Sequence, residues 1–105
     1  MMAGMRNFLV ESYVPRSRAG EQLRAANRAR LEAEAFASEG VSARYIRSIY
    51  VPADETCFHL LEAASAEAAA ELGRRASISV DRVVEAVIIA PSGLDRSEGA
   101  REEEL

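Results

Sequence analysis

The stretch from Arg44 to Ala63 constrains the fold of this chain more than any other. It contains two runs rich in β-branched and aromatic residues, RYIRSIYV and TCFHLLEA, separated by the short connector PADE. Such runs favour strands, and a connector with Pro and Asp favours a turn, so the stretch predicts a β-hairpin. Its second strand carries the only cysteine and the only histidine of the chain, Cys57 and His59. Because these residues are two apart, they share one face of the sheet.

The hydrophobic pattern outside the hairpin predicts four further elements. They are strands at residues 7–14 and 82–90 and helices at residues 18–39 and 66–75. The order β-α-β-β-α-β is the ferredoxin-like motif of α+β proteins, a four-stranded antiparallel sheet with two helices on one face.

Chain length and composition predict one domain. We expect a ferredoxin-like domain over residues 7–91, after a disordered N-terminus at residues 1–6. The polar and acid-rich segment 92–105 has no periodicity, and we expect a disordered tail there.

Alternation along the strands assigns their residues to two faces. One set is almost wholly apolar and is expected under the helices: Phe8, Val10, Val14, Ile46, Tyr50, Phe58, Leu60, Val84, Ala86 and Ile88. The other set mixes large apolar and polar groups: Leu9, Glu11, Tyr13, Tyr45, Arg47, Ile49, Cys57, His59, Leu61, Val83, Glu85 and Val87. Such a face is too hydrophobic for water and too polar for a dry core, so we expect a homodimer whose two sheets enclose a barrel-like, partly wet space. A β-bulge would shift this assignment.

Composition argues against several classes of function. The formal net charge is -4, whereas nucleic-acid binding normally requires a basic face. The longest apolar run, residues 83–90, is interrupted by Glu85 and is too short to span a membrane. A single cysteine and the absence of a signal-peptide pattern at residues 1–5 indicate a cytoplasmic protein.

Several segments together match a known pattern: Phe8–Glu11, Tyr45–Val51, Asp54, Cys57, Glu62-Ala63 and Arg82–Ala86. The chain resembles a bacterial domain-of-unknown-function family of small ferredoxin-like proteins, whose best-described type is a nickel-binding protein. The resemblance implies a dimeric α+β barrel and the binding of a divalent metal. The family often carries a histidine after the acidic residue of the second helix, whereas Leu72-Gly73-Arg74 follows Glu71 here.

The candidate metal ligands are His59, Cys57, Glu11 and Glu85. Thiol and imidazole groups suit nickel, zinc or copper, and the two glutamates share the predicted face. Two other interpretations stay open for the pair on the hairpin. One is a buried thiol beside a histidine that a carboxylate satisfies. The other is a nucleophilic Cys57 that His59 deprotonates and a glutamate orients.

The candidate residues for a small-molecule ligand are Arg47, Tyr13 and Tyr45. An Arg fork matches a planar carboxylate, and the tyrosines would stack on a ring-shaped ligand. The alternative is that Arg47 forms an internal ion pair and that the tyrosines pack at the dimer interface.

The first functional hypothesis is a cytoplasmic homodimer that binds or sequesters a divalent transition metal, with nickel the metal that the resemblance implies, and that is not an enzyme. No organic cofactor is implied. The second is a cofactor-independent monooxygenase or isomerase that uses the barrel cavity, with Glu11 or His59 as base and Arg47 holding an anion. The third is an interaction module without chemistry.

Overall fold

The computed structural model describes residues 4–91, so the predictions for residues 1–3 and 92–105 lie outside the described residues. The elements follow in the order β1 (Arg6–Tyr13), η1 (Arg16–Glu21), α1 (Gln22–Ser38), β2 (Ala43–Val51), η2 (Pro52–Asp54), β3 (Thr56–Ala63), α2 (Ala66–Arg75) and β4 (Arg82–Ala86). β4 is shorter than predicted, and a 3₁₀ turn precedes the first α-helix.

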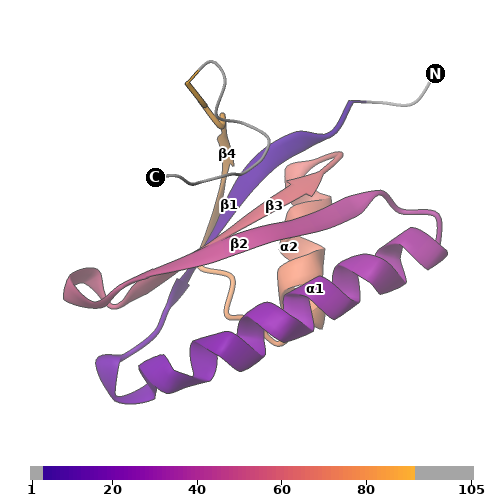
Figure 1. The fold of residues 1–105 in the computed structure, drawn as a ribbon. Coiled ribbons are helices and arrows are strands. Elements are labelled where there is room, and N and C mark those ends of the chain that lie inside the picture. Colours follow the sequence, from indigo (N-terminus) through magenta and orange to yellow (C-terminus); the bar gives the residue numbers. More distant parts are fainter. Residues whose placement is uncertain (1–3, 92–105) are drawn as a thin grey trace, which may run out of the picture.

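The four strands form one antiparallel sheet in the order β2-β3-β1-β4. Both helices lie on the same face of this sheet (Figure 1). This is the predicted ferredoxin-like arrangement, in which each helix connects two strands that are not neighbours. Among the described residues, no helix is long and apolar enough to cross a membrane.

Capping residues in the sequence mark the start of α2 and the end of α1. The Ser65 hydroxyl accepts a hydrogen bond from the Ala68 amide at 3.1 Å and thereby begins α2. Gly40, with φ +84°, follows the end of α1 in the left-handed conformation that glycine adopts without strain.

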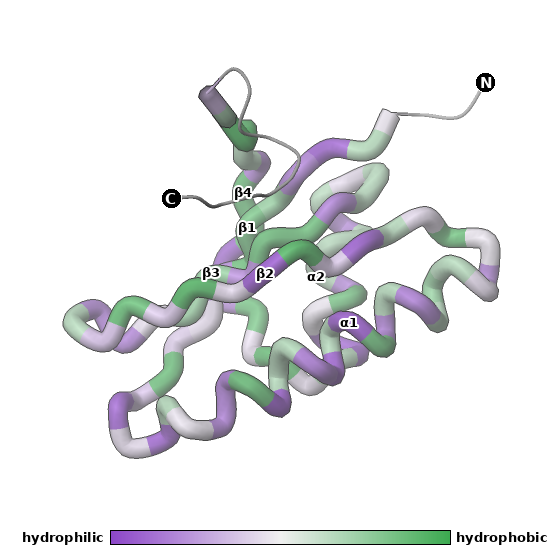
Figure 2. Tube along the Cα trace, in the orientation of Figure 1, coloured by the Kyte–Doolittle hydropathy of each residue, from purple (hydrophilic) through white to green (hydrophobic). Residues whose placement is uncertain are grey.

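The core lies between the sheet and the helices. Its buried residues come from the inner faces of all these elements: Phe8, Val10, Ala25, Ala29, Ala33, Phe36, Leu61, Ala63, Ala69, Leu72, Ala76 and Ile78. Small alanines on α1 let the helix approach the sheet closely. Figure 2 shows hydrophobic and hydrophilic residues mixed along the strands, without strict alternation.

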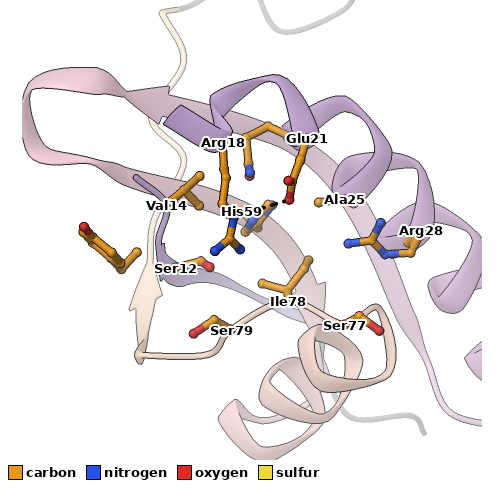
Figure 3. Close-up of a pocket in the computed structure, with 12 residues that line it drawn as sticks. Ser12, Val14, Arg18, Glu21, Ala25, Arg28, His59, Ser77, Ile78 and Ser79 are labelled. Atoms are coloured by element: carbon orange, nitrogen blue, oxygen red, sulfur yellow. Dashed lines mark ion pairs between the residues drawn. The ribbon is translucent and has the colours of Figure 1, made fainter. Parts of the chain in front are cut away.

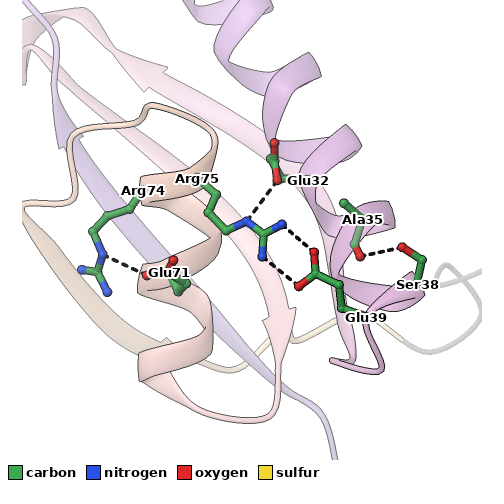
Figure 4. Close-up of polar contacts among 7 residues, drawn as sticks. All are labelled: Glu32, Ala35, Ser38, Glu39, Glu71, Arg74 and Arg75. Carbon is green, nitrogen blue, oxygen red and sulfur yellow. Dashed lines mark hydrogen bonds and ion pairs between the residues drawn. The ribbon is translucent and has the colours of Figure 1, made fainter.

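Arg75 ties the two helices together at one end of the molecule (Figure 4). This α2 side chain lies 3.3 Å from Glu32 and 2.7 Å from Glu39, both on α1. Its guanidinium also stacks over the Phe36 ring, 4.6 Å from the centroid. The charges of the helix surfaces therefore help to fix α2 against α1.

The predicted phase of β3 is wrong. Its buried residues are Cys57, His59, Leu61 and Ala63, so these side chains face the helices. The residues between them, Phe58 and Leu60, lie on the uncovered face of the sheet, because neighbours on a strand point to opposite sides. Both phases of this strand contain large apolar residues, so hydrophobic alternation alone did not identify the inner one.

The predicted phases of β2 and β4 also need correction. A bulge between Tyr45 and Arg47 places Tyr45 and Ser48 on the helix side, with Arg47 and Ile49 on the open side. Val83 is opposite the buried Val10, so it packs against the core instead of facing away from it.

The sheet face away from the helices is called the open face below. Its apolar residues are only partly buried or exposed: Leu9, Ile49, Phe58, Leu60 and Val84. Charged groups interrupt them, including Glu11, whose carboxylate lies 3.7 Å from Arg82. The predicted mixture of apolar and charged groups is present on this face, although several of its members differ from those predicted.

Candidate functional site

The structure does not bring the four predicted metal ligands together. Cys57 and His59 share a face, as predicted, but that face is covered by the helices, and their exposed fractions are 0% and 1%. Glu11 lies on the open face, because the β1 residue opposite His59 is Val10. Glu85 lies at the sheet edge, where it pairs with Arg6 at 3.2 Å.

His59 is anchored by a chain of hydroxyl groups that comes from β2. Its Nδ1 lies 2.7 Å from the Ser48 hydroxyl, which in turn lies 2.8 Å from the Tyr45 hydroxyl. Ser48 reaches the ring because the hairpin pairs these two residues directly across β2 and β3. The other ring nitrogen, Nε2, is buried and has no hydrogen-bond partner among the described residues.

Burial determines the protonation states of both hairpin groups. It lowers the pKa of His59 to about 4, so the imidazole is neutral at neutral pH. Burial raises the pKa of the Cys57 thiol to about 11, so this group is protonated and poorly nucleophilic. A thiolate at Cys57, which both metal binding and nucleophilic catalysis need, is therefore disfavoured.

A polar cavity of about 120 Å³, called the His59 pocket here, adjoins the histidine (Figure 3). It lies between the η1–α1 junction and the segment that follows α2. Its polar lining comes from residues distant in sequence: Ser12, Arg18, Glu21, Gln22, Arg28, His59, Ser77 and Ser79. Arg18 lies 3.6 Å from Glu21, and the Arg28 guanidinium donates to the Ala76 carbonyl at 2.6 Å.

The wall of this pocket after α2 is built by a helix C-cap. Ile78 donates its amide to the Gly73 carbonyl and Ser77 donates to the Arg74 carbonyl, each at 2.9 Å. Ser77 adopts a left-handed φ of 60°. This is the Schellman pattern, which turns the chain sharply and brings Ile78 and the neighbouring serines against the sheet.

A second cavity, an open groove of about 400 Å³, lies between α1 and β2. It brings together two of the predicted ligand-binding residues, Tyr45 and Arg47, and it includes Cys57. The third predicted residue, Tyr13, is absent from this lining; it is 57% exposed and contributes to the lining of the His59 pocket.

Sequence reasoning missed most residues around His59, both its hydrogen-bond partner Ser48 and the lining of the His59 pocket. Ser48 had a signal, because counting outward from the connector Pro52–Glu55 pairs it with His59. Arg18, Glu21 and Ser77 had none, because they reach the pocket through the packing of η1 and of the segment after α2 against the sheet.

The described residues of one chain do not supply a complete set of metal ligands. No group of three or more His, Cys, Asp or Glu side chains in residues 4–91 is arranged to hold a metal ion. His59 Nε2 fits a metal donor, because it is buried, neutral and unpartnered by the described protein groups, and its other nitrogen is held by a hydroxyl. Glu21 is the one carboxylate in the same pocket.

Comparisons with known proteins agree with the fold. The sequence matches the family described as "Nickel responsive protein SCO4226-like" over residues 8–86, which is more than half of the chain. Among solved structures, the chain is similar to SCO4226 from Streptomyces coelicolor A3(2), with 25% identity and a TM-score of 0.61. The similarity covers 80% of this chain and 99% of that one. No curated protein matches the chain.

Proposed function

This chain belongs to the SCO4226-like family of nickel responsive proteins, and we propose that it binds a divalent transition metal, nickel foremost, through His59. The role is binding or sequestration in the cytoplasm by a homodimer, without catalysis. Imidazole is a ligand that suits nickel, and at His59 it is neutral and has no hydrogen-bond partner on Nε2 among the described residues.

The observation that supports this proposal is the state of His59 Nε2. A buried polar atom without a partner is costly, so such an atom calls for an occupant. With Ser48 accepting a hydrogen bond from Nδ1, the ring would be oriented as metal-binding histidines are by their outer-shell partners. The remaining positions around the metal would be taken by water and by Glu21, whose carboxylate would leave Arg18.

Nickel titration of the tag-free protein tests the proposal, with zinc and copper alongside. We expect one nickel per chain, and we expect His59→Gln to abolish this binding because it removes the imidazole donor. Cys57→Ser is the matched control on the same strand and should retain binding, because the thiol is protonated. Circular dichroism of each variant checks that it is folded.

The pH dependence of nickel binding gives a second readout of the same experiment. Nickel competes with a proton for the imidazole, and the pKa of His59 is about 4 in the fold. Affinity should therefore be nearly constant from neutral pH down to about pH 5 and should fall below it. A fall centred near 6.5 would contradict the assignment of the metal to a buried histidine, and no binding of any of the three metals would remove the proposal.

The structure divides the two alternative bases of the enzyme hypothesis between the two faces of the sheet. Glu11 lies on the open face, where Arg47 also lies, whereas His59 lies on the helix-covered face, so the two bases would serve different sites. Arg47 and Tyr45 both contribute to the lining of the groove between α1 and β2, which includes neither Glu11 nor His59.

The open face supports the homodimer. It presents apolar side chains at half-buried or exposed positions, such as Ile49, Phe58 and Leu60, beside charged groups. A second copy that packs sheet to sheet would bury the apolar groups while the charged ones line a partly wet space. Such a dimer leaves the His59 pocket free, because that pocket lies on the other side of each sheet.

A further inference from the structure

We propose that the His59 pocket binds a small oxyanion, the size of acetate or phosphate, when no metal is bound. The proposal goes beyond metal binding, and it is carried by the hydrogen-bond chain at His59 and by the charges of the lining. The hydrogen-bond chain joins β2 to β3, and the lining comes from η1, α1, β1, β3 and the segment after α2.

The hydroxyl chain fits a His59 tautomer that carries its proton on Nε2. Each hydroxyl has one proton to donate, and among residues 4–91 the Tyr45 hydroxyl hydrogen-bonds to no group other than Ser48. In this tautomer Tyr45 donates to Ser48, and Ser48 donates to Nδ1 of His59, whereas the reverse order would place the proton on Nδ1. The neutral ring then carries its proton on Nε2, which makes Nε2 a buried donor.

A buried donor without an acceptor is the feature that an anion would satisfy. Nε2 has no acceptor among the described protein groups, and the histidine is 1% exposed. The nitrogen is closed to solvent, so an occupant reaches it only after the lining moves. Arg18 is the side chain best placed to move, because it is 62% exposed and reaches over the pocket toward Ser12 and His59 (Figure 3).

The charges of the lining favour an anion. Two guanidinium groups, from Arg18 and Arg28, face one carboxylate, from Glu21, so the lining carries a net positive charge. Arg18 uses its Nε toward Glu21, which leaves its two terminal nitrogens for a ligand. The hydroxyl of Ser12 adds a further donor in the lining. A volume of about 120 Å³ accepts a small oxyanion and excludes a nucleotide.

The anion and the metal cannot use His59 together. An anion needs the Nε2 proton, whereas a metal needs the Nε2 lone pair, which forms only when Ser48 accepts from Nδ1. Competition between the two occupants rests on the proposed function; binding of the anion to the metal-free protein does not.

NMR of the imidazole nitrogens tests the proposal on the full-length, metal-free protein. Because the chain has one histidine, the ¹⁵N signals belong to His59 alone. Titration with sodium phosphate or sodium acetate at constant ionic strength should give a saturable shift of Nε2, with the proton on Nε2 before and after binding. Arg18→Gln should weaken binding by about tenfold or more, because it removes a charge-assisted hydrogen bond.

Arg24→Gln is the matched control, since Arg24 is exposed on α1 and lies outside the pocket lining. It should leave the affinity unchanged. The absence of a saturable shift with both anions would overturn the proposal, as would equal weakening by the two arginine variants or a free protein with its proton on Nδ1. Nickel binding is measured separately, so either result can fail while the other stands.

Discussion

His59 combines two properties that rarely occur together in a small domain. It is one of the largest fully buried side chains, yet one of its ring nitrogens lacks a protein partner among the described residues. The desolvation of the charged imidazolium lowers its pKa to about 4. The fold therefore holds a neutral imidazole against its natural tendency to be protonated in mild acid.

This burial makes the stability of the protein pH-dependent in a defined window. The unfolded chain binds a proton at His59 below about pH 6.5, while the folded chain does so only below about pH 4. The free energy of unfolding should therefore fall as the pH is lowered from 6.5 to about 4, by at most about 3 kcal/mol. Above pH 6.5 this contribution is constant. Urea denaturation across this range measures the effect.

The His59→Gln variant separates the contribution of His59 to the pH dependence of stability from that of the titrating carboxylates. It lacks a titrating side chain at this position, so its stability should change much less than that of the wild type between pH 6.5 and about 5. Equal slopes for the two proteins would mean that the imidazole is solvated in solution and that its pKa is close to the ordinary value.

At the scale of elements, the close approach of α2 to the sheet explains why the segment after α2 can form a wall of the His59 pocket. Gly73 lies in the last turns of α2, where an added Cβ would lie 2.9 Å from the Val80 Cγ2 and 3.4 Å from the Val10 Cγ1. The absence of a side chain at Gly73 therefore lets the helix end, and the serines that follow it, sit close to the strands.

We expect Gly73→Ala to destabilise the protein by roughly 1 kcal/mol. Overpacking of this kind costs ~1–3 kcal/mol, and the better helix propensity of alanine returns at most about 1 kcal/mol. Gly20→Ala is the control, because no described atom lies within 4 Å of the added Cβ there. Thermal denaturation compares the two, and a Gly73→Ala variant more stable than the wild type would show that α2 has room to move.

The bulge in β2 is the other element-scale feature on which the site depends. Between Tyr45 and Arg47 the strand shifts register by one residue, so that Tyr45 and Ser48 both point inward. Without the bulge these two side chains would lie on opposite faces, and the hydroxyl chain to His59 would not form.

For the whole molecule, the central question is what covers the open face. A sheet whose uncovered side carries Leu9, Phe58 and Leu60 is expected to pack against another surface. The net charge of -4 and the charged groups interspersed on this face disfavour unspecific association between copies. A second copy, arranged with two-fold symmetry, would cover the apolar side chains while the charged groups line a partly wet space.

Ile49→Asp should convert the proposed dimer to a monomer at micromolar concentration, because it would place a charge among the apolar side chains of the proposed interface. Leu31→Asp is a closely matched control: both side chains are 55% exposed, but Leu31 lies on the outer side of α1. Size-exclusion chromatography with light scattering measures the mass of each variant. A monomeric wild-type protein, or dimers in both variants, would contradict the sheet-to-sheet arrangement.

The sequence by itself determined the elements, their order and the ferredoxin-like fold, and the predicted family resemblance is confirmed. These features depend on local signals: hydrophobic periodicity, the turn at residues 52–55 and the cap at Ser65. The pairing of Ser48 with His59 was also within reach, because a short hairpin connector sets the register.

Only the tertiary structure decided which side of β3 is inside. The strand has large apolar residues in both phases, such as Phe58 and Leu61, so the choice depended on the helices and on the neighbouring strands. That choice separated Glu11 from His59 and buried the histidine. It also placed Arg18, which is distant in sequence, in the same pocket as the ring. The sequence could not predict this proximity, because local periodicity does not encode long-range packing.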